Sequence, residues 1–215
     1  MRDPRPSIFP SSLLLFPFYL STLVAISPVS AANLIFVAWA VSWILAAVWS
    51  SRTQSRAGVA EQLPYRFITV AGFFLLFGVR PGRSDGYLVF WTLPDWASWI
   101  MTGLTGVGFA FAWWARLHLG KLWSAFVTRK TEHRIVDTGP YGIVRHPIYS
   151  GIILAAVAVA ILKANLYAII GALLIIIGFW IKARLEERFL SQQLGPETYA
   201  AYRNRVPMLF PKLLR

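Results

Sequence analysis

Two apolar runs with only three residues between them set the strongest limit on how this chain folds. Residues 148–162 and 166–181 are almost entirely apolar, and Lys163-Ala164-Asn165 is the whole connection between them. A connection this short joins two helices only as antiparallel neighbours. We therefore expect a helical hairpin that returns the residues after 181 to the level of the residues before 148.

Four more apolar runs precede the hairpin, at residues 12–26, 33–49, 64–79 and 96–114. Hydrophobic residues make up 57% of the 215 residues and charged residues 14%, against about 25% charged residues in soluble domains. A transmembrane helix needs about 20 apolar residues. The sequence therefore predicts an all-α, polytopic integral membrane bundle of about five or six transmembrane helices, surrounded by membrane lipids.

Basic residues gather in alternate connections between the runs. Residues 116–145 and the segment after 181 are strongly basic, whereas Arg80 and Arg83 after the third run are balanced by Asp85 and Asp95. Because basic connections stay in the cytoplasm, we expect both termini and the 116–145 loop on the cytoplasmic side. This bias and anionic lipid headgroups explain the net charge of +12, and we expect no nucleic-acid partner.

The first run admits a second interpretation. Arg2 and Arg5, the apolar residues 13–26 and the small residues 29–32 follow the order of a cleavable signal peptide, although Pro17 fits its apolar part imperfectly. In either case the second run crosses toward the cytoplasm, so the predicted side of the later loops is the same.

The residue types exclude several kinds of site. The chain has no cysteine, and its three histidines lack the HExxH spacing, so we expect no metal centre. Residues 103–108, GLTGVG, look like a nucleotide-binding loop but lie inside an apolar run rather than between a strand and a helix. We expect Gly106, Gly108 and Ala112 to serve close helix packing, and no Rossmann domain.

A polar segment stands directly before the hairpin, at residues 138–151, TGPYGIVRHPIYSG. It combines hydrogen-bonding and aromatic side chains with glycines that allow close backbone approach. The simplest alternative is a basic interface anchor followed by a proline that starts a helix. The side chains and the glycine that we expect to form a site are Tyr141, Arg145, His146, Tyr149 and Gly151.

Paired acids follow the hairpin at Glu186 and Glu187. The hairpin returns them to the level of His146 and Tyr149, where carboxylates beside a histidine and a tyrosine suit a bound cation. Salt bridges with neighbouring arginines are the alternative.

The basic tail places Tyr199, Tyr202 and Arg205 three residues apart, which predicts one shared face of a short helix. Without other information, an interfacial amphipathic helix explains the tail nearly as well as a catalytic role. Trp123, in the segment LGKLWS, is either an interface residue or part of a pocket wall.

The order of these motifs resembles the isoprenylcysteine carboxyl methyltransferase family of integral membrane enzymes, relatives of the phospholipid methyltransferases. The resemblance rests on GPY, VRHPIYSG, the apolar hairpin, EERFL and the Tyr–Tyr–Arg–Val–Pro tail, and covers residues 114 to 211. It implies N-terminal transmembrane helices over residues 1–113 and a methyltransferase core over residues 114–215 that faces the cytoplasm.

The resemblance also implies chemistry: methyl transfer from S-adenosylmethionine to the carboxylate of a prenylated cysteine, or to phospholipid amines or small thiols in related enzymes. By motif, Tyr141, Arg145, His146, Tyr149, Gly151, Glu186 and Glu187 surround the donor, with Glu186 also catalytic. Arg205 acts on a lipophilic acceptor, beside Tyr202 and Trp123. A carboxylate acceptor suits the planar, bidentate guanidinium of Arg205.

A membrane sterol-type reductase is the main alternative, since such enzymes hold NADPH with a similar Arg-His-Pro-x-Tyr turn. Ile148 stands here where they typically carry asparagine. Paired acids also suit a cationic donor better than the phosphates of NADPH. A scaffold without enzymatic activity is the third interpretation. The sequence leaves the acceptor and the oligomeric state open.

Overall fold

The computed structural model describes residues 26–47, 53–56, 58–79, 88–120, 128–130 and 136–212. Nearly all of the first apolar run, with its signal-peptide alternative, and Trp123 lie outside these residues. In the described part of the chain, each of the five later apolar runs forms a helix. The elements are α2 (Pro28–Ala46), β1 (Thr53–Arg56), α3 (Val59–Phe73), η3 (Phe74–Gly78), α4 (Asp95–Leu119), β2 (Thr128–Lys130), α5 (Pro140–Ile143), α6 (Pro147–Lys163), α7 (Leu166–Leu194) and α8 (Pro196–Arg205).

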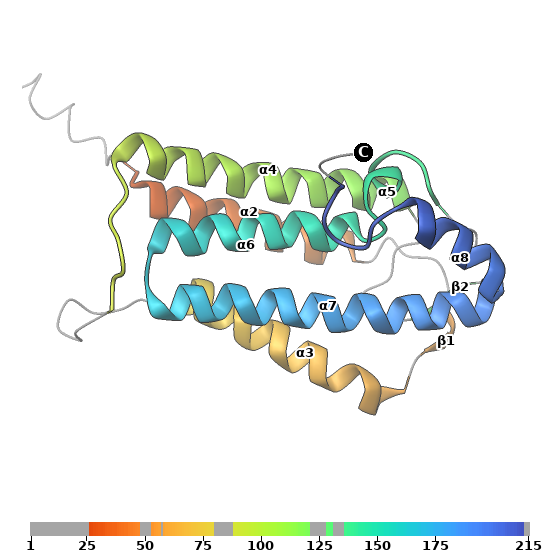
Figure 1. Ribbon diagram of the computed structural model, residues 1–215. Coiled ribbons are helices and arrows are strands. Elements are labelled where there is room, and N and C mark those ends of the chain that lie inside the picture. Colours follow the sequence, from red (N-terminus) through yellow and green to blue (C-terminus); the bar gives the residue numbers. More distant parts are fainter. Residues whose placement is uncertain are drawn as a thin grey trace, which may run out of the picture.

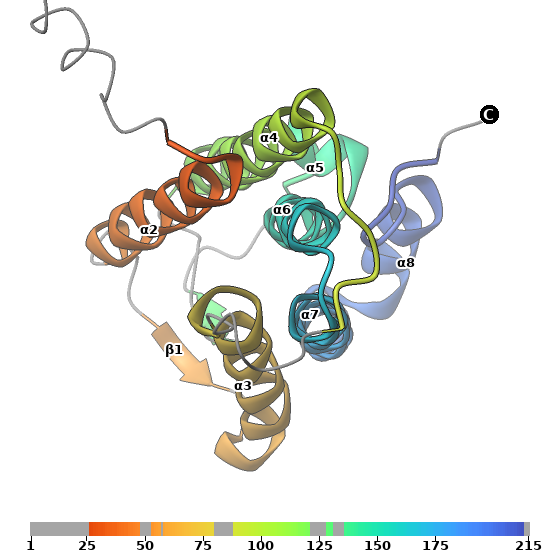
Figure 2. The same ribbon diagram turned by 90° about the vertical axis from the view of Figure 1, so that its left-hand side faces the viewer.

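The long helices form one bundle with α6 at its centre. In both views, α6 lies between α4 and α7, while α2 lies beside α4 and α3 beside α7 (Figures 1 and 2). By length and composition, α2 and α7 are apolar enough to cross a membrane, and α6 is a shorter apolar helix. The predicted helical class is confirmed for the bundle.

The hairpin predicted from the three-residue connection is confirmed. Pro147 starts α6, and the helix ends at Lys163 because Ala164 adopts a left-handed conformation with φ of 51°. Asn165 then caps α7, since its side-chain oxygen accepts a hydrogen bond from the Ala168 N–H at 2.9 Å. The turn is therefore short because one helix ends and the next is capped within two residues.

Glycines allow α4 and α6 to approach closely. A β-carbon built on Gly108 would lie 2.5 Å from the carbonyl oxygen of Gly151 and 2.7 Å from the Ala155 nitrogen. A β-carbon on Gly151 would lie 2.8 Å from the Ala112 nitrogen. The packing role predicted for Gly108 and Ala112 is confirmed, with Gly151 as their partner, whereas a β-carbon on Gly106 would meet only Ile35 Cδ1, at 4.0 Å.

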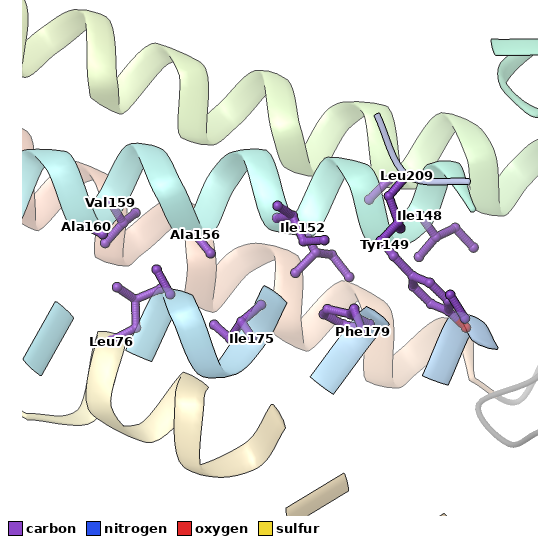
Figure 3. Close-up of a cluster of buried hydrophobic side chains, with 14 of the residues drawn as sticks. Leu76, Ile148, Tyr149, Ile152, Ala156, Val159, Ala160, Ile175, Phe179 and Leu209 are labelled. Carbon is purple, nitrogen blue, oxygen red and sulfur yellow. The ribbon is translucent and has the colours of Figure 1, made fainter. Parts of the chain in front are cut away.

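The apolar core follows the length of the α6–α7 contact. Val159 and Ile175 are fully buried, and η3 adds Leu76 at the far end (Figure 3). At the other end Tyr149 and Phe179 stack with ring centroids 4.8 Å apart. Tyr149 is thus the residue at which the apolar core meets the polar end of the bundle.

One feature was not expected from an all-α chain. β1 and β2 form a short antiparallel pair, in which Thr53 is opposite Lys130 and Arg56 is opposite Thr128. Both strands are polar and three or four residues long, so they carry no alternating apolar pattern that would signal a strand.

Candidate functional site

Four segments that are distant in the sequence meet at one end of the bundle. They are α5, the start of α6, the last third of α7, and α8 with the tail that follows it (Figure 1). The hairpin accounts for the first three, because it carries α7 back past the start of α6. The predicted grouping of the acids with His146 and Tyr149 is therefore present.

Arg145 and Glu187 form a buried ion pair in this group. Their side chains are 7% and 10% exposed, and the Nε and a terminal nitrogen of Arg145 each lie 2.7 Å from Glu187 Oε1. Arg145 also donates to the carbonyl oxygens of Arg203 and Val206. The guanidinium therefore connects α7 to the end of α8.

His146 lies between the two acids. Its Nε2 is 3.3 Å from Glu187 Oε1, and its Nδ1 is 3.5 Å from Glu186 Oε2. Burial by itself lowers the pKa of His146, but the hydrogen bonds and negative charges of Glu186 and Glu187 outweigh burial and raise the pKa above 6.5. The arrangement therefore favours a protonated imidazole.

Tyr149 holds the second acid. Its hydroxyl donates to Glu186 Oε1 at 2.7 Å, and its ring lies parallel to that of His146 with centroids 5.4 Å apart. Glu186 is more open than Glu187, with 20% of its side chain exposed. A carboxylate has about four acceptor positions, so Glu186 can accept hydrogen bonds from a ligand besides those within the site.

Tyr141 is a buried support of this end of the bundle. Its hydroxyl lies 3.4 Å from the Ala115 carbonyl oxygen, and its own carbonyl accepts a hydrogen bond from the Tyr202 hydroxyl at 2.8 Å. Burial raises the pKa values of Tyr141 and Tyr202, so both phenols stay protonated. In this arrangement Tyr141 connects α4 to α8.

The tail after α8 runs back over the start of α6. The N–H groups of Arg145 and His146 donate to the carbonyl oxygens of Pro207 and Met208 at 2.8 and 3.1 Å. The Ser150 hydroxyl donates to the Leu209 carbonyl at 2.6 Å. The tail therefore holds the two residues that lead into α6, and one of them, His146, is the N-cap of that helix.

Arg205 is placed differently from the expectation. Its side chain is 66% exposed and pairs with Asp137 at 2.9 Å, whereas Tyr199 and Tyr202 are buried. The prediction that Arg205 shares a face with Tyr199 and Tyr202 is therefore wrong. A step of three residues turns a helix by about 300° rather than a full turn, so two steps carry Arg205 away from the face of Tyr199.

Gly151 also differs from the expectation, because it packs against α4 rather than next to the acids. Its predicted place beside a donor stays a prediction. Lys182, which the motifs did not single out, reaches one of the acids and also the ring of Tyr65. Lys182 Nζ lies 3.9 Å from Glu186 Oε1, and 5.7 Å from the ring centroid of Tyr65 on α3. A lysine four residues before a glutamate was the only signal for the first contact, and Tyr65 carried none.

The part of the chain that carries the site also matches a known protein family. Residues 101–192 match the model of the isoprenylcysteine carboxyl methyltransferase (ICMT) family. This match includes the segment of Tyr141 to Gly151, the hairpin and both acids, and ends before Tyr199, Tyr202 and Arg205.

The individual relatives include a metal-resistance protein, an isoprenylcysteine methyltransferase and a thiol methyltransferase. A cobalt-zinc-cadmium resistance protein of Cupriavidus metallidurans is 30% identical over 65% of this chain and 57% of its own length. Protein-S-isoprenylcysteine O-methyltransferase B of Arabidopsis thaliana is 31% identical over 40% of this chain and 43% of its own. Methanethiol S-methyltransferase 2 of Bradyrhizobium diazoefficiens is 34% identical over 57% of this chain and 50% of its own.

The alignments thus span only about half the length of these relatives. The resemblance of this chain to the isoprenylcysteine carboxyl methyltransferase family is confirmed, with residues 101–192 as the part that matches.

Proposed function

We propose that this protein is a membrane methyltransferase that transfers a methyl group from S-adenosylmethionine to a lipophilic acceptor. The observation that carries the proposal is the buried group of Glu186, Glu187, His146 and Tyr149 at one end of an apolar bundle. Carboxylates there suit the ammonium and ribose hydroxyls of the donor, and aromatic rings suit its sulfonium.

We assign different roles to the two acids. Glu187 accepts from both Arg145 and His146, so its role is to hold these side chains in place. Glu186 is more exposed and keeps acceptor positions, so it is the acid that binds the donor directly. Methyl transfer is an in-line displacement, which depends on alignment and exclusion of water more than on acid catalysis.

The outer surface of the bundle supports a membrane location with several spans. Large apolar side chains face outward on α2 and α3, including Ile44 at 70% and Phe67 at 78% exposure. Apolar surface of this extent is unfavourable in water, whereas contact with lipid tails stabilises it. We propose five or six spans, with the site facing the cytoplasm as the basic loops predict.

The acceptor proposed first is the carboxylate of an isoprenylcysteine-type lipid, in line with the family that matches. A small thiol is the second candidate, because a methanethiol S-methyltransferase is among the relatives. The position of Arg205 does not favour either acceptor, because this residue lies at the surface, where it pairs with Asp137.

Ligand binding tests the donor. Calorimetry of the detergent-purified protein should detect S-adenosylhomocysteine and not NADPH. Binding of NADPH alone would favour the reductase, and binding of neither would favour a scaffold.

Substitution of Arg205 tests its role at the acceptor. An exposed ion pair contributes at most about 1 kcal/mol, so Arg205→Ala should melt close to the wild-type temperature. If Arg205 grips a carboxylate, Arg205→Lys should cut turnover of a prenylcysteine by roughly tenfold to a hundredfold, and Arg205→Ala by more, with donor affinity unchanged. Asp137→Asn removes the same surface pair and is the control. Wild-type turnover in Arg205→Ala would leave the tail as a lipid anchor.

A further inference from the structure

The helix α3 precedes the part of the chain that matches the family, and yet it borders the site. It runs beside α7 in both views (Figures 1 and 2). A β-carbon on Gly171 of α7 would lie 2.8 Å from the carbonyl oxygen of Gly72 on α3. A β-carbon on Gly178 would overlap Thr69 Oγ1. These glycines bring the two helices close together up to one turn before Lys182.

Tyr65 is held in place on α3 by a buried amide. Its side chain belongs to a residue that is 3% exposed, and its hydroxyl donates to Gln62 Oε1 at 3.1 Å. Gln62 is 2% exposed, and the same oxygen accepts a hydrogen bond from Arg66 at 2.8 Å. Because buried polar groups in such a network restrain one another, the ring of Tyr65 has a fixed position against α7.

Lys182 of α7 lies close to two aromatic rings. Its side chain is 12% exposed, and a lysine is rarely buried without specific partners. Its Nζ lies 5.1 Å from the ring centroid of Tyr149 and 5.7 Å from that of Tyr65. Both distances are within the range of a cation–π contact, about 6 Å. Since these rings come from α6 and α3, the ammonium is held by both helices that neighbour α7.

These contacts leave the ammonium at a distance from Glu186. Nζ lies 3.9 Å from Glu186 Oε1, whereas charge-assisted N–H···O bonds span about 2.7–2.9 Å. The Tyr149 hydroxyl reaches the same oxygen at 2.7 Å. A Lys182 side chain at hydrogen-bond distance would occupy a further acceptor position of Glu186, and the carboxylate has only about four.

On the basis of the proposed function, we propose that Tyr65 is a positioning residue of the donor site. Its ring holds the Lys182 ammonium at a distance from Glu186, which keeps acceptor positions of that carboxylate available to the donor. Tyr65 acts through Lys182 and not on the donor itself. The proposal gives α3 a role in donor affinity, in addition to the segments that the motifs identify.

Calorimetry with S-adenosylhomocysteine tests this inference. Tyr65→Leu removes the ring and should weaken binding by about three- to tenfold, because the shift of Lys182 toward Glu186 is limited by the energy of one cation–π contact. Tyr65→Phe keeps the ring and should bind within about twofold of the wild type. Tyr167→Leu is the matched control and should bind like the wild type, since Tyr167 is 40% exposed in the first turn of α7, at the other end of the bundle.

A double-mutant cycle separates positioning from a general loss of structure. In the Lys182→Met background no ammonium needs to be held, so the addition of Tyr65→Leu should change S-adenosylhomocysteine affinity by less than about twofold. A loss of the same size in both backgrounds would show that Tyr65 acts without Lys182 and would overturn the inference. Unchanged affinity in Tyr65→Leu, or an equal loss in Tyr65→Phe, would overturn it as well.

If Tyr65→Leu does not fold, a series of increasingly fluorinated phenylalanines at position 65 decides. Fluorine nearly keeps the shape of the ring but weakens the negative face that attracts a cation. Donor affinity that falls stepwise along the series supports the inference, and constant affinity overturns it. Absence of S-adenosylhomocysteine binding by the wild type would instead overturn the proposed function.

Discussion

At the scale of single residues, the site separates two acids that are adjacent in the sequence. Glu187 is bound by Arg145 and His146, whereas Glu186 is bound by Tyr149 and by the other nitrogen of His146 and stays more open. Neighbouring side chains on a helix point about 100° apart. Helix geometry therefore directs Glu187 toward the guanidinium of Arg145 and Glu186 toward Tyr149.

The first prediction compares these acids. Glu187→Gln should lower the free energy of unfolding by about 2–4 kcal/mol, because a buried guanidinium loses its counter-charge. Glu186→Gln should lower the stability by less, because Arg145 keeps its counter-charge and only His146 loses one, and should weaken S-adenosylhomocysteine binding by about tenfold, the loss expected of one charge-assisted hydrogen bond. Glu197→Gln, an exposed acid on α8, is the control for both measurements. Equal effects of the two core substitutions on stability and on binding would contradict this division.

The second prediction concerns pH. The pKa of His146 is raised above 6.5 in the folded protein, so the folded state binds the proton more tightly than the unfolded state does. The resulting stability is present in full below about pH 6.5, the pKa of an unperturbed histidine, and is lost as pH rises through the raised pKa. The melting temperature of the wild type should therefore fall over that interval relative to His146→Asn. Parallel curves for the two proteins would show that His146 is not charged.

At the scale of the elements, α4 and α6 depend on glycine at their contact. Gly108 and Gly151 face each other so closely that a β-carbon on either would overlap the other helix. Gly103, one and a half turns earlier on α4, has no atom within 4 Å of the place of a β-carbon.

The third prediction follows from this contrast. Gly151→Ala should destabilise the bundle by about 1–3 kcal/mol, as overpacking does, and should lower donor affinity because Tyr149 is displaced with α6. Gly103→Ala should have no effect or raise stability by up to about 1 kcal/mol, since alanine is the better helix former. Melting curves in detergent give both values. A tolerated Gly151→Ala would mean that the two helices are less closely packed.

At the scale of the whole molecule, the C-terminal tail completes the end of the bundle. Its carbonyl groups accept hydrogen bonds from the N–H groups of Arg145 and His146, the two residues before α6, and Leu209 is 3% exposed within the core (Figure 3). The neighbouring Phe210 is 64% exposed.

The fourth prediction uses this adjacent pair. Leu209→Ala should cost about 2–4 kcal/mol of stability through the cavity it leaves and should weaken donor binding, because the tail then no longer holds Arg145 and His146. Phe210→Ala should leave both unchanged. A Leu209→Ala protein with lower stability but full donor affinity would mean that the tail supports the fold and not the site.

The sequence alone determined the helices, the hairpin and the meeting of the acids with His146 and Tyr149. These features depend on apolar runs, on a proline and an asparagine at helix starts, and on a connection too short for any other path. Such determinants are local, so they can be read from neighbouring residues. The packing role of Gly108 and Ala112 could be read in the same way.

Only the tertiary structure decided which groups each side chain meets. It showed Arg145 on Glu187, Lys182 between Tyr65 and Tyr149, the tail carbonyls on α6, and Arg205 at the surface with Asp137. These contacts join residues from different helices, and they depend on how far each helix is rotated and shifted against its neighbours. The packing of the whole bundle sets those rotations and shifts, and no short stretch of sequence encodes them.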